Sequence, residues 1–402
     1  MSERSGLARF ALGAAAGLTI GYTAWRAYEA RNDLRAPAPA RPRDAKRYGE
    51  TRRLLMVLGI ARSTAGSALW AFGLADGCER ALAWLPVPLR LPAFVGLVSV
   101  AEAVREWPID YIEDHQLERI FGNSERSVAA WNADRTKAAL LGAVVGKVLA
   151  GGAGTLMRRA PRRWTWIAIA GLPVLLAFAN VIAPTFVLPL FNKYVPLEGS
   201  LEMRIRELAA RYGVGGATIL RFDMSRQTKK ANAFVTGVFG TERIAIADTL
   251  LDGFAEDETL FVVAHELGHY VKRDPWVAIA LGTALTAVPL LIGNGIVRRT
   301  TGRDAGNVGT AMRLAFYLQI GQLLAMPLAN AFSRAIERRA DRFALAATNN
   351  ADSGVRAFRR LRDQNLAEDQ GPKWAELLFA SHPSLKSRIA ALEAAPSTTA
   401  QY

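Results

Sequence analysis

Long apolar stretches recur along this chain, and each approaches the roughly 20 residues that a helix needs to cross a bilayer. Within lipid, a helix satisfies its own backbone hydrogen bonds, which an isolated strand or loop cannot do. The sequence therefore predicts a predominantly α-helical multi-pass membrane protein with about seven transmembrane helices. They are expected at residues 7–25, 54–74, 91–111, 138–156, 164–190, 276–297 and 311–332.

The overall composition fits a membrane protein better than it fits a soluble one. Hydrophobic residues make up 51% of the 402 residues, and the net charge is +14. We find no basic cluster interleaved with aromatic residues, so we expect no nucleic-acid partner and instead expect arginine-rich loops beside membrane spans. The single cysteine, Cys78, excludes an intramolecular disulfide and a cysteine-cluster metal site.

Several charged residues interrupt the apolar stretches. Arg62 and Lys147 lie within the second and fourth, and the third contains Glu102, Arg105 and Glu106. Charges at that depth usually face a bundle interior or a water-filled cavity. The third stretch has an alternative reading, an interfacial helix that does not cross the membrane.

The polar segments define the expected organisation and orientation. A membrane region of five spans at 1–190 contains a Pro- and Arg-rich loop at 26–53. Two catalytic parts, 191–275 and 333–394, flank the last two spans at 276–332, and 395–402 is a disordered tail. The arginine-rich loop at 26–53 indicates that the catalytic side faces the cytoplasm, although short basic loops near 158–163 and 298–303 argue the other way.

The stretch "FAEDETLFVVAHELGHYVKRD" predicts a helix, since its apolar residues recur with helical spacing and acidic residues crowd its start. His265 and His269 lie four residues apart, so both imidazoles project from one face and can reach a single metal ion. Glu266 lies beside them, where it can take a proton from an activated water molecule. An open site of imidazole and carboxylate ligands favours Zn²⁺, one ion per chain.

A third ligand is expected after the last span. In "NAFSRAIERRADRFAL", Glu337 and Asp341 lie four apart on one helical face. This arrangement suits one carboxylate that binds the metal and a second that orients a liganding imidazole. A merely solvated charged face is the alternative.

Two further stretches have candidate roles. Residues 225–254 alternate and carry β-branched residues, which predicts a strand or hairpin before the catalytic helix. An edge strand there could hold a substrate backbone, or it could be purely structural. His382, in "ASHPSLKSRIAAL", could donate a hydrogen bond to a developing oxyanion or merely cap the following helix.

With these motifs in order, the chain resembles the type I CAAX prenyl endopeptidase family, which consists of seven-span zinc metalloproteases. The resemblance extends over residues 91–392. It rests on "PLFNKYVPLEGSL", "NAFVTG", "RIAIADTLL", "HELGH", "NAFSRAIERRAD" and "HPSLKSRI".

The resemblance implies a zinc metalloendopeptidase, with a ring of tilted helices around an intramembrane chamber and a small α+β zincin-like catalytic domain. It implies that His265, His269 and Glu337 bind Zn²⁺, that Glu266 is the general base, and that Asp341 supports His265. It further implies that His382 and Arg334 line the site and that a substrate-binding strand carries Asn232, Ala233 and Phe234.

The chain departs from the family pattern at Tyr270 and Asp274, and we expect neither to touch a ligand. The alanine- and arginine-rich composition suggests a bacterial inner-membrane protein that acts on membrane-associated peptides or proteins, which can be lipid-modified. Membrane lipids are its other expected partners, and the oligomeric state is left open. The rival hypotheses are an ion-handling transporter or channel and a scaffold that binds hydrophobic peptides without cleaving them.

Overall fold

The computed structural model describes residues 44–237, 241–302 and 306–395. Within this part of the chain, six helical segments are long and apolar enough to cross a membrane. They are Ala45–Ala81, Val87–Ile120, Val128–Arg159, Trp164–Leu190, Asp274–Thr301 and Val308–Thr348. Each of these six segments contains or coincides with one predicted span. The remaining predicted span, 7–25, lies outside the described residues.

In three of these segments an α-helix continues into a short π-helix, and one of the three ends in a 3-10 helix. The first joins α2 (Ala45–Leu69) to α3 (Ala75–Ala81) through the π-turn η1 (Trp70–Leu74). The second joins α4 (Val87–Asp110) to α5 (Leu117–Ile120) through η2 (Tyr111–Gln116). The fourth continues α7 (Trp164–Ile182) through η3 (Ala183–Val187) and η4 (Leu188–Leu190). Pro184 lies in the first turn of the π-helix η3, and prolines and π-bulges are the usual causes of helix kinks.

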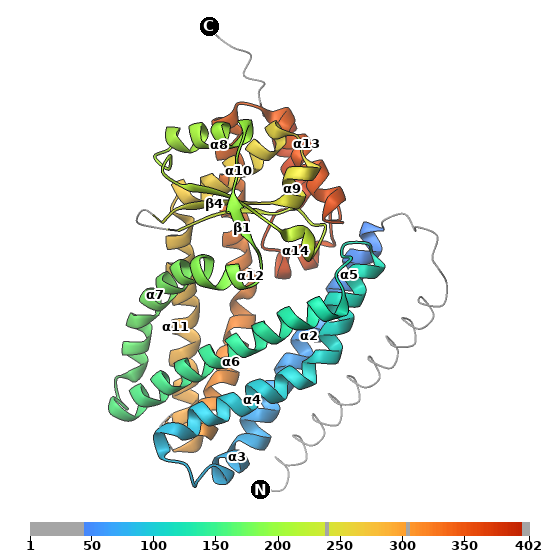
Figure 1. The fold of residues 1–402 in the computed structure, drawn as a ribbon. Coiled ribbons are helices and arrows are strands. Elements are labelled where there is room, and N and C mark those ends of the chain that lie inside the picture. The colour runs from blue at the N-terminus through green and yellow to red at the C-terminus, as the bar shows by residue number, and fades with distance from the viewer. Residues whose placement is uncertain (1–43, 238–240, 303–305, 396–402) are drawn as a thin grey trace, which may run out of the picture.

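The remaining spans are single helices: α6 (Val128–Arg159), α11 (Asp274–Thr301) and α12 (Val308–Thr348). In Figure 1 the membrane helices are tilted against one another, and α4 crosses beside α6 while α11 runs beside α7 and α12. The third predicted stretch falls within Val87–Ile120, which meets the length and composition required for a span.

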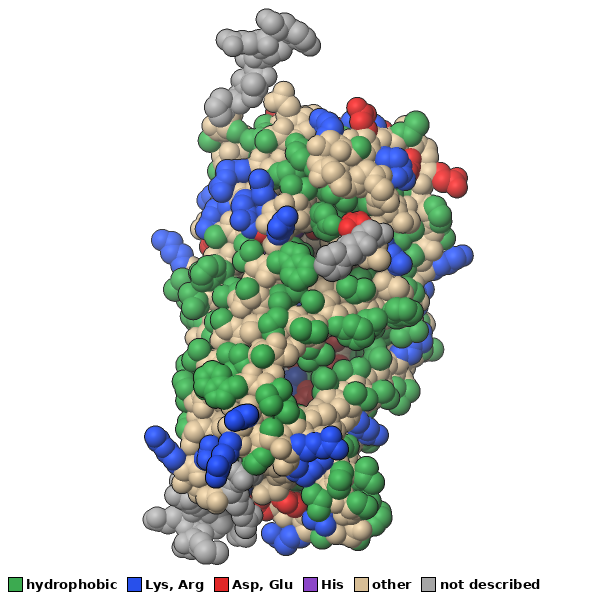
Figure 2. Space-filling model, turned by 90° about the vertical axis from the view of Figure 1, so that its left-hand side faces the viewer, with side chains coloured by type: hydrophobic (Ala, Val, Ile, Leu, Met, Phe, Trp, Pro, Cys, Tyr) green, Lys and Arg blue, Asp and Glu red, His purple; other side chains and the backbone are tan. Residues whose placement is uncertain are grey.

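Four of the charged residues inside the spans, Arg62, Glu102, Arg105 and Glu106, pair with one another. Arg62 Nε donates to Glu106 Oε2 at 2.8 Å, and Arg105 Nη2 lies 2.6 Å from Glu106 Oε1 and also contacts Glu102. Figure 2 shows a hollow in the apolar face, inside which acidic and basic side chains are visible. These observations agree with the expectation that the charges face an interior space and not lipid.

A small sheet lies beyond the membrane helices. Its four strands are β1 (Tyr194–Pro196), β2 (Thr218–Phe222), β3 (Ala233–Thr236) and β4 (Arg243–Ala247), in the order β1-β2-β4-β3. The pair β2–β4 is parallel, and the pairs β1–β2 and β3–β4 are antiparallel. The predicted hairpin is thus β3–β4, with β3 at the edge of the sheet. It begins later than expected, since Met224–Arg226 forms the short helix η5.

Helices surround this sheet. They are α8 (Ser200–Arg211), α9 (Asp248–Gly253), α10 (Glu256–Val271), α13 (Ala351–Gln364), α14 (Lys373–Phe379) and α15 (Leu385–Glu393). The long helix α12 extends from the membrane bundle into this globular part (Figure 1). There α12 packs against α10, and both contribute to one core that includes the fully buried Phe261, Leu267 and Ala344. This packing fixes the position of the candidate site.

Candidate functional site

The helix predicted around "HELGH" is α10. Its first turn contains Glu256, Asp257 and Glu258, and Glu258 Oε2 accepts a hydrogen bond from the backbone N–H of Ala255 at 3.0 Å. This contact satisfies one of the free N–H groups at the helix start. His265 and His269 project from one face, and their Nε2 atoms are 3.2 Å apart.

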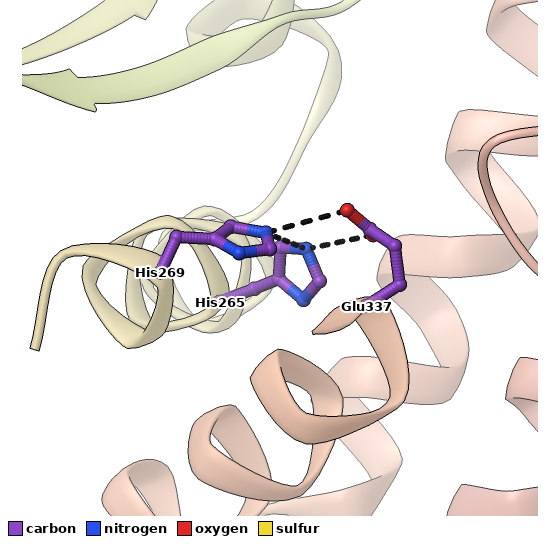
Figure 3. A group of neighbouring side chains, drawn as sticks. All are labelled: His265, His269 and Glu337. Atoms are coloured by element: carbon purple, nitrogen blue, oxygen red, sulfur yellow. Dashed lines mark hydrogen bonds and ion pairs between the residues drawn. The ribbon is translucent and has the colours of Figure 1, made fainter. Parts of the chain in front are cut away.

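Glu337 reaches these imidazoles from α12. Its Oε2 lies 3.3 Å from His265 Nε2, and its Oε1 lies 3.4 Å from His269 Nε2 (Figure 3). The three candidate ligand atoms all lie within 4.8 Å of one another. The structure therefore brings together the three residues that the sequence nominated as ligands.

Two properties of this cluster fit a metal ion. Glu337 Oε2 is buried without a hydrogen-bond partner among the described residues, which is costly unless a cation balances it. Burial acts to lower the pKa of His265, but the carboxylates of Asp341 and Glu337 outweigh burial and raise this pKa to about 9. The surroundings of the imidazole thus favour positive charge. Two imidazoles and one carboxylate also leave a fourth position open, as in catalytic zinc sites.

Asp341 lies behind His265. Its Oδ1 is 2.9 Å from His265 Nδ1, so the carboxylate can accept the Nδ1 proton and leave Nε2 to face the metal position. Asp341 is in turn held by Arg388 of α15, whose Nη2 donates to Oδ1 at 2.6 Å and whose Nε donates to Oδ2 at 2.9 Å. Arg388 also lies over the ring of Phe358, 4.2 Å from its centroid.

Our sequence reasoning missed Arg388. It lies within "HPSLKSRI", one of the stretches that carry the family resemblance, but nothing local distinguishes it from the many other arginines of the chain. Its partner Asp341 lies far away in the sequence. Only the packing of α12 against α15 brings the two together.

The expectation that Asp274 would not touch a ligand is wrong. Asp274 Oδ2 lies 2.9 Å from His269 Nδ1, and Asp274 Oδ1 accepts a hydrogen bond from Arg339. Asp274 comes to this position because the chain turns sharply between α10 and α11. Tyr270 does not reach a ligand, since its hydroxyl donates to Glu242 Oε1 at 2.7 Å.

Three further residues predicted for the site are Glu266, His382 and Arg334. Glu266 follows His265 on α10, and burial raises its carboxyl pKa, as suits a group that must accept a proton. His382 Nε2 lies 3.4 Å from Glu337 Oε1, and its side chain is 60% exposed. Arg334 instead donates to the backbone carbonyls of Glu376 and Ala380, at 2.9 and 2.7 Å. It therefore braces the segment before His382, and its role in catalysis stays a prediction.

The predicted substrate strand lies beside the metal helix. Ala233 and Phe234 belong to the edge strand β3, which packs against α10, and Asn232 precedes it. The Asn232 carbonyl accepts a hydrogen bond from the Ala247 N–H at 2.9 Å. Because backbone groups alternate along an antiparallel pair, Ala233 and Val235 direct their N–H and C=O groups away from β4.

Comparison with known proteins agrees with this geometry. Residues 49–193 match the family described as CAAX prenyl protease N-terminal, five membrane helices, and residues 197–395 match Peptidase family M48. The uncharacterized metalloprotease YhfN of Bacillus subtilis (strain 168) is 25% identical over 86% of this chain and 84% of that protein. A CAAX prenyl protease 1 homolog of Dictyostelium discoideum is 32% identical, over 63% of this chain and 61% of that protein.

The fold has a counterpart among solved structures. The crystal structure of S. mikatae Ste24p matches with a TM-score of 0.72 and 22% identity, covering 98% of this chain and 99% of that one. None of these similarities supports a transporter, a channel or a non-cleaving scaffold. The chain belongs to peptidase family M48 and is a multi-pass membrane metalloprotease.

Proposed function

We propose that this chain is a zinc endopeptidase that hydrolyses peptide bonds of membrane-associated peptides or proteins. The observation that carries the proposal is the convergence of His265, His269 and Glu337 from two helices onto one position. Zn²⁺ is favoured because imidazole and carboxylate ligands with an open position suit a redox-inert Lewis acid. When bound there, zinc would polarise the scissile carbonyl and activate water.

The side chains around this position have separate roles in the reaction. Glu266 takes the proton of the attacking water and passes it to the leaving amine, a role for which its raised pKa is suited. His382, close to Glu337, donates a hydrogen bond to the oxyanion that develops on the scissile carbonyl. Asp341 and Arg388 keep the imidazole of His265 oriented.

The substrate backbone binds to the free edge of β3. The N–H and C=O groups of Ala233 and Val235 point away from β4, so an extended peptide can add as a further strand. Since β3 packs against α10, such a peptide would pass along the metal helix. Because these contacts involve only the peptide backbone, the strand should bind substrates with different side-chain sequences.

Substrates of this enzyme reach the site from the membrane. Relatives named CAAX prenyl proteases suggest that a lipid-modified peptide is accepted. From the alanine- and arginine-rich composition we place the protein in a bacterial inner membrane, and from the arginine-rich loop at 26–53 we place the site on the cytoplasmic side.

Metal removal tests the catalytic proposal. The purified chain should contain about one zinc per chain by elemental analysis, as expected for one site with three protein ligands. It should cleave a generic fluorogenic peptide, lose this activity with a zinc chelator, and regain it on titration with zinc. Cleavage that persists after complete metal removal would rule out the mechanism. Comparing kcat/KM for a peptide with and without a lipid group tests the substrate class.

The orientation can be tested separately. The sole cysteine, Cys78, can be replaced by serine, and single cysteines introduced by Trp84→Cys and Lys229→Cys. Trp84 is highly exposed between α3 and α4, at the end of the bundle remote from the sheet. A membrane-impermeant thiol reagent added to intact spheroplasts should label the cysteine at 84 and spare the one at 229. The reverse pattern would place the site outside the cytoplasm.

A further inference from the structure

Both histidines of the candidate metal centre touch a carboxylate through Nδ1. His265 Nδ1 lies 2.9 Å from Asp341 Oδ1, and His269 Nδ1 lies 2.9 Å from Asp274 Oδ2. Each carboxylate is also paired with an arginine: Asp341 with Arg388, and Asp274 with Arg339. Asp341 and Asp274 are both buried, with 7% and 6% of their surfaces exposed.

The position of Asp274 depends on a break between two helices. Arg273 has φ of 59°, in the left-handed region, and it lies between Lys272, which caps the end of α10, and Asp274, the first residue of α11. In an unbroken helix, a residue five positions after His269 would point about 140° away from it. The left-handed residue instead turns the chain so that Asp274 faces back to His269. Asp274 then occupies the first turn of α11, where the helix dipole stabilises a carboxylate.

We infer that Asp274 is a positioning residue for the metal ligand His269. This inference rests on the proposed role of His269. The carboxylate accepts the Nδ1 proton, fixes the tautomer in which Nε2 carries the free lone pair, and directs that lone pair towards Glu337. Arg339 holds the carboxylate from α12, so a single chain of contacts links the metal helix to two membrane helices.

The contacts predict an unusual order among variants. In Asp274→Asn, the amide oxygen should face Arg339, because a guanidinium can only donate hydrogen bonds. The NH2 group then faces His269 Nδ1 and donates to it. This arrangement favours the wrong tautomer, with the proton on Nε2. In Asp274→Ala a water molecule can take the place of the carboxylate, so the alanine variant should bind metal better than the asparagine variant.

Zinc affinity and the histidine tautomer test the inference directly. Zinc dissociation constants are measured on the full chain in detergent by competition with a chromophoric chelator. Asp274→Ala should weaken zinc binding by about 10–100-fold, the usual effect of losing such a partner, and Asp274→Asn by more. Asp274→Asn/Arg339→Ala should bind zinc more tightly than Asp274→Asn alone, since the freed amide can then turn. Asp257→Asn, which breaks an ion pair at the far end of α10, is the matched control and should bind within about two-fold of wild type.

Nitrogen NMR gives a readout that is independent of activity. With ¹⁵N-labelled histidine, the four imidazoles of the chain can be assigned by substitution. Metal-free wild type should show a proton on His269 Nδ1, and Asp274→Asn should move it to Nε2. Unchanged affinity and tautomer in Asp274→Asn would overturn the inference while leaving the proposed function intact. Absence of divalent-metal binding by the wild-type chain would instead contradict the proposed function. Should Asp274→Asn fail to fold, the zinc dissociation constants of Asp274→Ala and of the double variant, each compared with that of Asp257→Asn, still test the inference. Values within about two-fold of this control would overturn it.

Discussion

Glu337 Oε1 lies 3.4 Å from His269 Nε2, although the whole of α11 separates the two residues in the chain. The contact exists because α12 is long enough to serve two purposes. Its first part is a membrane span, and its last turns pack against α10 inside the globular part. The candidate metal site is therefore attached directly to the membrane bundle.

Removal of the proposed general base should separate metal binding from catalysis. Glu266→Gln keeps the size of the side chain but cannot accept a proton, so turnover should fall by about 10²–10⁴-fold, the usual contribution of such a group. Zinc content by elemental analysis should not change, because Glu266 is not one of the three converging residues. Glu256→Gln, an exposed acid on the same helix, is the control. Wild-type turnover in Glu266→Gln would exclude the assignment.

Arg388 should matter for metal binding although it touches no metal. Arg388→Ala leaves Asp341 without its two hydrogen bonds and should weaken zinc binding by about 10–100-fold. Arg388→Lys should recover only part of this loss, since lysine cannot form the bidentate pair. Arg359→Ala removes an exposed ion pair with Glu393 and should have little effect. Equal zinc affinity in Arg388→Ala and Arg359→Ala would show that the pair is not required.

Gly268 sets how closely α10 approaches α12. A Cβ atom at this position would lie 3.0 Å from Phe343 Cδ1 and 3.2 Å from Phe343 Cβ. Gly268→Ala should therefore destabilise the protein by about 1–3 kcal/mol through overpacking and weaken zinc binding, because it separates the histidines from Glu337. Thermal unfolding with and without zinc measures both effects. Gly152→Ala adds a methyl group that meets no atom within 4 Å beyond its chain neighbours and the backbone of its own helix, so it should not destabilise the protein. A stable, tightly binding Gly268→Ala variant would contradict this account.

His382 should act on turnover more than on substrate binding. His382→Ala should lower kcat by about 10²–10³-fold with little change in KM, as for loss of a single oxyanion donor. Steady-state kinetics with a soluble peptide separates the two constants. Lys386→Ala, on α15 nearby, provides the comparison. A change confined to KM would indicate that His382 binds substrate in the ground state.

The free edge of β3 should be sensitive to loss of a single N–H group. Val235→Pro removes an N–H that points away from β4, so the sheet keeps its own hydrogen bonds while a docked peptide loses one. We expect KM to rise several-fold, in line with about 0.5–1.5 kcal/mol for one hydrogen bond. Val235→Ala loses the side chain but retains the N–H, and its KM should stay near that of wild type. If both variants raise KM equally, the backbone contact is not used.

Sequence periodicity determined the elements that depend on local pattern. The apolar stretches identified every span that the structure describes, and the spacing of His265 and His269 placed both on one face of α10. Such features repeat every few residues, so they can be read without knowledge of the fold. The spacing of Glu337 and Asp341 also placed both on one helical face. That this face would meet the histidines of α10 was predicted from the family resemblance and not from the spacing.

Tertiary structure alone decided the contacts between distant elements. Nothing in the sequence pairs Arg388 with Asp341. The sequence led us to expect no ligand contact from Asp274, which reaches His269 only because Arg273 turns the chain into the left-handed region. The hydrogen bonds of Arg334 to the backbone before His382 were likewise not visible in the sequence. Side-chain direction at a helix junction depends on one backbone angle, and long-range pairs depend on how helices pack. Neither leaves a periodic trace in the sequence.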